Sequence, residues 1–181
     1  SSSGHWGQYF EDLYGLTLLG AAQAWDATRG QGVVVAVIDT GIDYNHPDLR
    51  ANIWTNPHEI PDNGVDDDGN GFVDDVRGWD FVGSNAVAPV PDNNPADVNA
   101  HGTHVAGTIA AVGDNNLGIV GVAWNAKVMA VRALDDGGIG YDSTLAEAIV
   151  YAADNGADVI NASWGRVGTS QILADAIGYA H

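Results

Sequence analysis

Asp39 is the first residue whose position suggests chemistry. It follows six apolar and mostly β-branched residues, 33–38 (VVVAVI), which predict a strand buried on both faces of a parallel sheet. The carboxyl end of such a strand is where α/β proteins place ligand-binding and catalytic groups. A turn former or a helix cap explains a lone aspartate there equally well. Taken alone, the residue leaves both interpretations open.

His101 and His104 form a second candidate for chemistry. They have the spacing His-x-x-His, but the zinc-protease pattern also needs a glutamate beside the histidines, and this segment has none. Zinc is therefore only weakly indicated. Residues 102–112 are small or apolar and predict a helix, which places His101 at the helix start.

The third candidate is an acidic stretch within residues 52–98, a segment rich in Asp, Asn, Gly and Pro that is predicted to be mostly loop. Its oxygen-bearing residues have the spacing of an EF-hand-like calcium loop, with Gly71 at the sharp turn. Arg77 stands where an EF-hand has its bidentate glutamate, so this is not an EF-hand. Crowded carboxylates repel one another without a cation, although a merely solvated acidic loop is the alternative. The candidate ligands are Asp66, Asp68, Asn70, Phe72, Asp74 and Asp75.

Composition limits the possible partners. Against 24 acidic residues the chain has 6 basic ones, a formal net charge of −18, which argues against binding to nucleic acid or to an anionic membrane surface. There is no cysteine, so disulfides and a thiol nucleophile are excluded. No apolar run approaches the roughly 18 residues that span a bilayer.

Strands and helices are predicted to alternate along the chain. Helices are expected at 18–28, 102–112, 143–155 (capped by Ser143) and 169–180, and strands at 33–38, 77–82, 127–132 and 158–162. This alternation predicts a three-layer α/β fold, a mostly parallel sheet flanked by helices. We expect one domain over residues 1–181, with an N-terminal arm at 1–17 and an acidic loop insertion at 52–98. The fold is expected to be incomplete at the C-terminus, since another strand should follow the last helix.

Four segments together resemble the subtilisin-like serine proteases, the subtilases. They are AVIDTGIDYNHPDL (36–49), HGTHVAGTIAA (101–111), GVAWNAKVMAVRAL (121–134) and DVINASWG (158–165), and they occur in the family's order. The resemblance implies a serine endopeptidase with an Asp-His-Ser triad, in which Asp39 orients the imidazole and His101 is the general base. His104 is then a packed structural residue. An aspartic protease shares the Asp-Thr-Gly string, but it needs an all-β fold and a second copy.

The family's nucleophile lies in a G-T-S-M-A-x-P block. Residues 168–170 match only its first three letters, and Ser170 is interpreted as the N-cap of the last predicted helix. The serine is therefore expected beyond this chain, and the chain is expected to be an inactive fragment of a secreted parent protease. The alternative function is that of a catalytically inactive, calcium-stabilised peptide-binding fragment.

The resemblance also implies binding sites. An extended peptide substrate would pair with the segment Gly138, Ile139 and Gly140, and Ser163, Trp164 and Gly165 would line the pocket for the residue before the scissile bond. Further partners are the protein's own propeptide or its C-terminal remainder. Calcium is the implied cofactor, and a first site would use Asp48, Asn115, the carbonyls of Leu117 and Ile119, and a side chain of the N-terminal arm such as Gln8.

Overall fold

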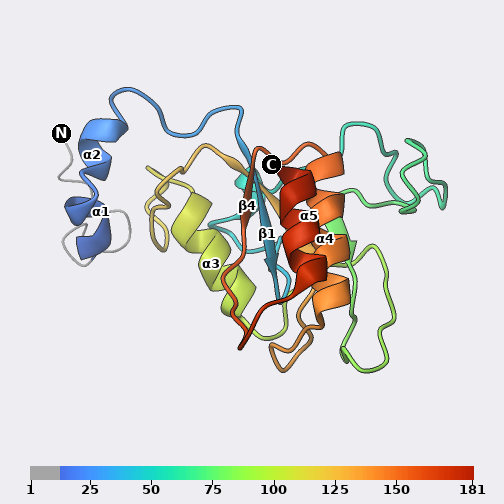
Figure 1. Cartoon of the computed structure of the whole chain (residues 1–181). Helices are drawn as coiled ribbons and strands as arrows, with labels where there is room; N and C mark the ends of the chain where they lie inside the picture. The colour runs from blue at the N-terminus through green and yellow to red at the C-terminus, as the bar shows by residue number, and fades with distance from the viewer. Residues whose placement is uncertain (1–12) are drawn as a thin grey trace.

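The computed structural model describes residues 13–181, and its centre is a four-stranded sheet (Figure 1). The strand order is β2-β3-β1-β4, and every pair is parallel. The predicted α/β fold with a parallel sheet is confirmed. The strands are β1 (Val34–Asp39), β2 (Gly78–Asp80), β3 (Lys127–Arg132) and β4 (Val159–Asn161).

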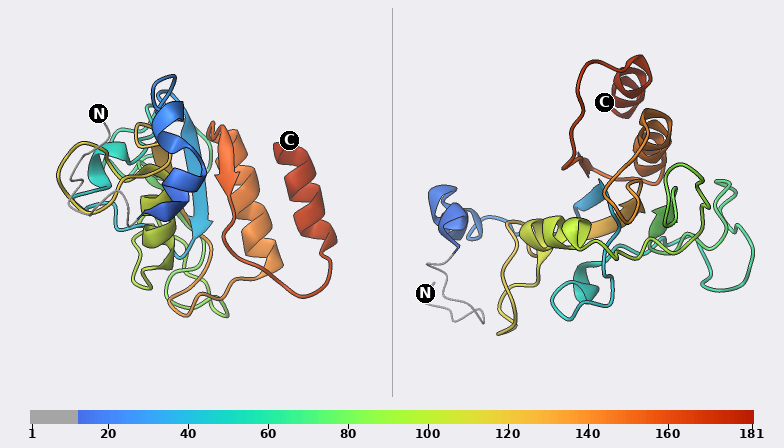
Figure 2. Two further views of the ribbon diagram at one scale, coloured as in Figure 1. Left: turned by 90° about the vertical axis from the view of Figure 1, so that its left-hand side faces the viewer. Right: turned by 90° about the horizontal axis from the view of Figure 1, so that it is seen from below.

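Helices cover both faces of the sheet, which gives the three layers expected from the sequence. One face carries α3 and the other carries α4, against which α5 packs, as the views in Figures 1 and 2 show. The helices are α1 (Tyr14–Leu18), α2 (Ala21–Ala24), α3 (His101–Ala110), α4 (Asp142–Asp154) and α5 (Gln171–Ala180), with a 3₁₀ turn at Arg50–Asn52. Within residues 13–181, no helix is long and apolar enough to cross a membrane.

The central strand β1 is buried on both faces because its neighbours in each layer are apolar. Ala36 and Ile38 belong to the core formed with α4 and α5, while Val37 belongs to the core formed with α3. Successive side chains of a strand point to opposite faces, so a continuous apolar run is what a strand between two helical layers requires. The resulting core holds the end of β1, and with it Asp39, in a fixed place.

Two local predictions are wrong. The helix predicted at residues 18–28 is instead two short helices, α1 and α2, because Gly20 adopts a left-handed φ of 65° that interrupts the first helix. Ser143 does not cap α4. That helix begins one residue earlier, at Asp142, and the residue at its N-cap is Tyr141, which makes no side-chain capping bond.

Candidate active site

Asp39 and His101 meet at the carboxyl end of the sheet. Asp39 is the last residue of β1 and its side chain is fully buried, whereas His101 is the first residue of α3 and its side chain is 52% exposed. The imidazole Nδ1 lies 2.7 Å from Asp39 Oδ1. A carboxylate at Nδ1 favours the tautomer with the proton on that nitrogen, so Nε2 keeps its lone pair and can accept a proton.

The carboxylate of Asp39 is held mainly through one oxygen. Oδ1 accepts the backbone N–H of Thr40 at 2.7 Å as well as the contact with His101. Oδ2 is buried and has no hydrogen-bond partner among residues 13–181. A buried carboxylate with spare acceptor capacity is well suited to stabilise a positive charge on the neighbouring imidazole.

The start of α3 lies directly against the end of β1, and Gly102 makes this possible. Its backbone N–H donates to Thr40 Oγ1 at 3.0 Å. A Cβ at this position would lie 2.2 Å from the carbonyl oxygen of Gly41 and 3.1 Å from Cβ of Asp39. Only glycine therefore allows His101 to approach Asp39 so closely.

His104 differs from its sequence prediction. It was expected to be a packed structural residue, but its side chain is exposed on α3. It lines a hollow of about 320 Å³ together with His46 and Asp48. Within the described residues, the one cluster of three or more metal-ligating side chains contains no histidine.

The segment predicted to pair with a peptide follows β3 and is exposed. Ile139 is 59% exposed, and its carbonyl accepts the N–H of Asp135 at 2.9 Å, while Gly138 N–H donates to the Asp135 carbonyl at 2.9 Å. The Asp135 carboxylate accepts the N–H groups of Gly137 and Ile139 through Oδ1. Because β1 and β3 are parallel, this turn leaves the sheet at the same edge as Asp39.

The second predicted substrate segment follows β4 and also leaves at this edge. Ser163 is exposed and donates from Oγ to Asn161 Oδ1 at 2.9 Å, and Gly165 is exposed as well. Trp164 is half-buried, and its indole N–H donates to the Ile38 carbonyl of β1 at 3.0 Å. Its indole is thus anchored on the sheet, and it lines a hollow of about 350 Å³ with residues of β4 and α5.

The residues of the first predicted calcium site lie together around Asp48. Its buried carboxylate accepts the side-chain amide of Asn115 at 2.6 Å and the backbone N–H of Ile119 at 3.0 Å. Leu117 belongs to the same turn, because its N–H donates to Asn115 Oδ1. Gln8 lies outside the described residues. Asn115 therefore presents its amide nitrogen to Asp48, while its amide oxygen is bound by Leu117.

The acidic loop brings three carboxylates together, but not the set predicted from its spacing. Oxygens of Glu59, Asp68 and Asp75 all lie within 4.8 Å of one another, and Glu59 and Asp75 are buried. Asp66 and Asp74 are not in this cluster. Glu59 was missed by the sequence analysis, since no spacing rule connects it to the loop.

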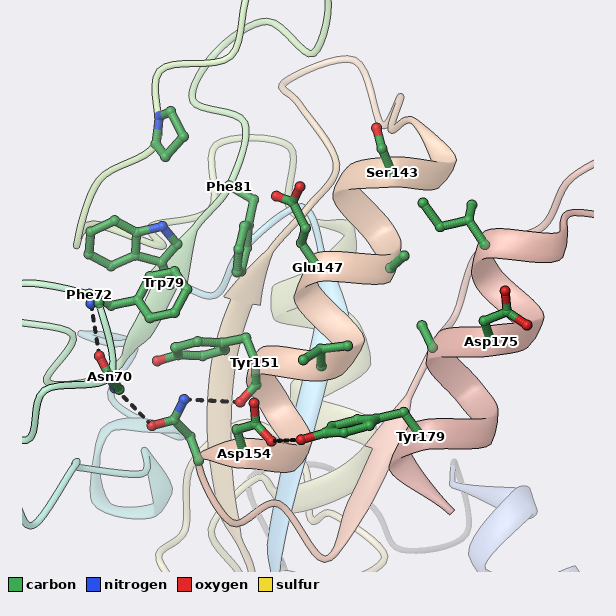
Figure 3. A pocket seen from close by; sticks show the side chains of 17 residues that line it. Asn70, Phe72, Trp79, Phe81, Ser143, Glu147, Tyr151, Asp154, Asp175 and Tyr179 are labelled. Atoms are coloured by element: carbon green, nitrogen blue, oxygen red, sulfur yellow. Dashed lines mark hydrogen bonds between the residues drawn. The ribbon is translucent and has the colours of Figure 1, made fainter.

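Asp66 and Asp74, which lie outside the carboxylate cluster, stabilise the turns of the loop by accepting backbone hydrogen bonds. The carboxylate of Asp66 accepts the N–H groups of residues 69, 70 and 71, and that of Asp74 accepts those of Asn63 and Gly64. Asn70 does reach the cluster, with its amide 3.1 Å from Asp75 Oδ2. The ring of Phe72 packs edge-on against Trp79, Phe81 and Tyr151 (Figure 3).

The carboxylate cluster and the Asp39–His101 pair lie at opposite ends of the sheet. The cluster is joined to the C-terminal end of α4, where Tyr151 donates to Asp75 and Asn155 contacts Asn70. Helix α4 runs back from the carboxyl end of β3 to the beginning of β4, so its last turn lies at the edge opposite to Asp39. A cation held there would act on the fold and not on the reacting atoms.

One large hollow bounded by residues 13–181 is separate from the candidate active site. It measures about 810 Å³ and lies between the acidic loop, α4 and α5, with Glu147, Tyr151 and Tyr179 among its lining residues (Figure 3). Neither Asp39 nor His101 borders it. The candidate chemistry therefore belongs to the facing side chains of Asp39 and His101 and not to this hollow.

Comparison with known proteins decides the family. The family model described as the subtilase family matches residues 30–180. The chain belongs to the subtilases. The matched range contains both Asp39 and His101, together with the acidic loop and all four strands.

Curated subtilase relatives are similar over most of this chain. The thermophilic serine proteinase of Bacillus sp. (strain AK1) is 43% identical over 158 residues, which are 87% of this chain and 32% of that protein. Thermitase of Thermoactinomyces vulgaris is 39% identical over 167 residues, 92% of this chain and 50% of that protein. The chain thus spans a third to a half of the length of these two relatives.

Solved structures give the same result for the fold. Sphericase superposes with a TM-score of 0.64 at 35% identity, covering 83% of this chain and 43% of that one. A protease from Pseudoalteromonas arctica PAMC 21717 superposes with a TM-score of 0.67 at 35% identity, covering 87% and 48%. The parallel sheet with flanking helices is therefore the subtilase arrangement.

Proposed function

We propose that this chain contributes the aspartate and histidine of the catalytic triad of a subtilisin-type serine endopeptidase. The observation that carries the proposal is the 2.7 Å contact between His101 Nδ1 and the buried carboxylate of Asp39, with the imidazole half exposed. Membership of the subtilase family supports the same activity. The nucleophilic serine is proposed to lie beyond this chain.

In the proposed mechanism, His101 accepts the serine proton on Nε2 as the hydroxyl attacks the peptide carbonyl. Asp39 keeps the ring in the tautomer that leaves Nε2 free and stabilises the imidazolium that forms. His101 then returns the proton to the leaving amine. The end of β1 and the start of α3 are held together here, because Thr40 N–H donates to the Asp39 carboxylate and Gly102 N–H donates to Thr40 Oγ1.

Activity of the complete protease tests the assignment. Replacing His101 by Ala or Asp39 by Asn is expected to lower kcat by about 10³- to 10⁶-fold, the range that triad members show. The control is His104→Ala, on the same helix but exposed, which is expected to keep activity within a few-fold. Near-normal activity of the His101 variant would refute the proposed base.

We propose that the substrate is an extended peptide or protein segment lying along Gly138, Ile139 and Gly140. The exposure of Ile139 and the position of this turn at the same sheet edge as Asp39 support the proposal. Ser163, Trp164 and Gly165 would border the residue before the scissile bond. Ile139→Pro, which removes the N–H that donates to the Asp135 carboxylate and so disturbs this turn, is expected to raise KM for peptides more than it lowers kcat.

Calcium is the proposed cofactor. Glu59, Asp68 and Asp75 form a cluster of hard oxygen ligands, and a second ligand set gathers around Asp48 and Asn115. The three carboxylates repel one another at this distance, and a bound cation would offset that repulsion. Calorimetric titration is expected to show calcium binding, and EDTA is expected to lower the melting temperature; absence of both effects would refute the sites.

We further propose a secreted protein, since extracellular calcium concentrations suit such sites.

The alternative function is a catalytically inactive, calcium-stabilised peptide-binding fragment, with the propeptide or the C-terminal remainder of the protease as partner. One observation favours it for the chain taken alone: among residues 13–181, no serine hydroxyl makes a hydrogen bond to His101. A serine-directed fluorophosphonate probe separates the two functions. Labelling of the isolated chain would refute the alternative. Labelling of the complete protease, but not of the isolated chain, would support a triad whose serine lies beyond this chain.

A further inference from the structure

Asp97 lies four residues before His101, in the loop that leads into α3, and its carboxylate is the acceptor of an unusual number of hydrogen bonds. On Oδ1 it accepts the hydroxyl of Thr40 at 3.0 Å and the backbone N–H groups of Asn99 at 2.9 Å and Ala100 at 3.0 Å. On Oδ2 it accepts the backbone N–H of Thr103 at 2.9 Å and its hydroxyl at 2.6 Å. Five donors from three segments of chain thus converge on one side chain.

The two threonines that bind Asp97 flank the catalytic pair. Thr40 directly follows Asp39, and its hydroxyl also accepts the N–H of Gly102, the residue after His101. Thr103 lies two residues after His101, and its hydroxyl also accepts the N–H of Asp43 at 2.9 Å. Each hydroxyl therefore joins the segment that follows β1 to the first turn of α3. Each has a single proton, and each donates it to Asp97, which fixes the orientation of both hydroxyls.

The same carboxylate holds a strained residue next to the histidine. Ala100 has a φ of 81°, in the left-handed region that is unfavourable for a non-glycine residue. Its N–H is bound by Asp97 Oδ1. This conformation turns the chain from the loop into the helix and determines the direction in which the side chain of the next residue leaves the backbone. A lone helix cap would not explain the bond to Thr40, which lies 57 residues away in the chain.

Asp97 is suited to this role at the pH values where a serine protease works. Partial burial raises its pKa, but the hydrogen bonds from Thr103, Ala100 and Thr40 oppose burial more strongly, so its pKa lies below the ordinary value of 3.8. The stabilisation it supplies is therefore complete above the ordinary pKa and is lost only as pH falls through the lowered one. Near neutral pH the carboxylate is ionised and all of its acceptor sites are available.

We propose that Asp97 is a positioning residue that sets the distance and orientation between Asp39 and His101 by holding Thr40 and Thr103 together. It does not touch the reacting atoms. The effect of Asp97 on catalysis rests on the proposed function. Its effect on the contact between Asp39 and His101 does not depend on that function. Its loss is expected to leave the fold in place while loosening the bond between the imidazole Nδ1 and Asp39.

The test observes the Nδ1 proton of His101 by NMR in the isotope-labelled protein. In the wild type this proton, held between Nδ1 and Asp39, should give a signal far downfield of the backbone amides. In Asp97→Ala we expect the signal to move upfield or broaden, and its exchange with solvent to become about tenfold faster. The control is Asp92→Ala in the same loop, where an exposed carboxylate accepts the N–H of Asn94 and no other hydrogen bond from residues 13–181; this variant should behave like the wild type.

A second pair of variants separates positioning from charge and from unfolding. Thr103→Val removes one donor to Asp97 without changing any charge, and Thr103→Ser restores the hydroxyl. The inference requires the valine variant to show the faster exchange and the serine variant to recover the wild-type signal. It is overturned if Thr103→Val leaves the signal unchanged, or if the two variants behave alike. Because the readout is the proton between two residues of this chain, failure of the complete protease to cleave peptides would refute the proposed function and leave this result standing.

Discussion

The hydroxyl of Tyr151 donates to Asp75 Oδ2 at 2.6 Å, and this bond joins the core to the acidic loop. Tyr151 belongs to α4 and is buried, and Asp75 is fully buried in the carboxylate cluster. Burial, together with the nearby charge of Asp75, raises the pKa of Tyr151 well above its ordinary range, so the phenol remains a donor at all ordinary pH values. The loop is therefore coupled to the helix that packs on the sheet, and cation binding there is expected to stabilise the whole fold.

Replacing Tyr151 by Phe is expected to destabilise the protein by about 1–3 kcal/mol, because Asp75 loses one of its donors while remaining buried. Urea unfolding with and without calcium measures the effect, and the loss should be larger without the cation. Tyr179→Phe is the matched control, since Tyr179 makes a similar 2.6 Å bond to Asp154 but is 61% exposed. Equal effects of the two substitutions would contradict the coupling.

Calcium affinity is expected to depend on Asp68 and not on its neighbour Asp67. Asp68 belongs to the carboxylate cluster, whereas the Asp67 carboxylate accepts the N–H of Ile60 and the side-chain amide of Asn63. Asp68→Asn should weaken binding by about tenfold or more, because a hard cation loses a charged ligand. The stability of the calcium-free protein should not fall, since the change relieves repulsion. Titration calorimetry of Asp68→Asn and of the matched control Asp67→Asn decides, and equal affinities of the two variants would remove Asp68 from the site.

Much of the fold was predictable because its signals are local. The strand predicted at residues 127–132 coincides with β3, and the apolar run before Asp39 became β1 with a shift of one residue. Both strands lie between helical layers, so their composition is determined by burial on two faces. The break at Gly20 was not predicted because a glycine inside a helical pattern is ambiguous until its φ is known.

The site was predictable to the extent that it depends on sequence motifs. Asp39 and His101 were identified, and the structure brings them into contact. The cluster membership of Glu59 was not predicted, because it depends on how a turn-rich loop folds back on itself over a separation that no spacing rule covers. The convergence on Asp97 was hidden for the same reason, since its bond to Thr40 exists only once β1 and α3 are packed together.

Gly102 is expected to tolerate no side chain. In Gly102→Ala the new Cβ would meet the carbonyl oxygen of Gly41 at 2.2 Å, so the start of α3 must move away from β1. A displacement of about 1 Å at a catalytic group costs about 100-fold in rate, and kcat/KM of the complete protease should fall by about this factor. Gly107→Ala on the same helix is the control. Its Cβ meets Ile119 Cδ1 at an ordinary 3.5 Å, so this variant should gain about 0.5–1 kcal/mol of stability and keep its activity.

The turn that presents residues 138–140 is expected to weaken in acid through Asp135. The Asp135 carboxylate accepts the N–H of Ala86, and this hydrogen bond lowers the pKa of Asp135 most. The N–H groups of Ile139 and Gly137 add to this effect. Because the folded-state pKa lies below the ordinary value of 3.8, the carboxylate contributes stability that is complete above that value and is lost as pH falls through the folded-state pKa.

Asp135→Asn removes this contribution. The wild type should therefore exceed the variant in unfolding free energy at neutral pH, by no more than about 1 kcal/mol because solvent screens the partly exposed carboxylate. The difference should shrink below pH of about 4, where the wild-type carboxyl becomes protonated. Urea unfolding of both proteins across this pH range measures it. A difference that stays constant from neutral pH down to pH of about 2 would show that the ionised carboxylate does not hold the turn.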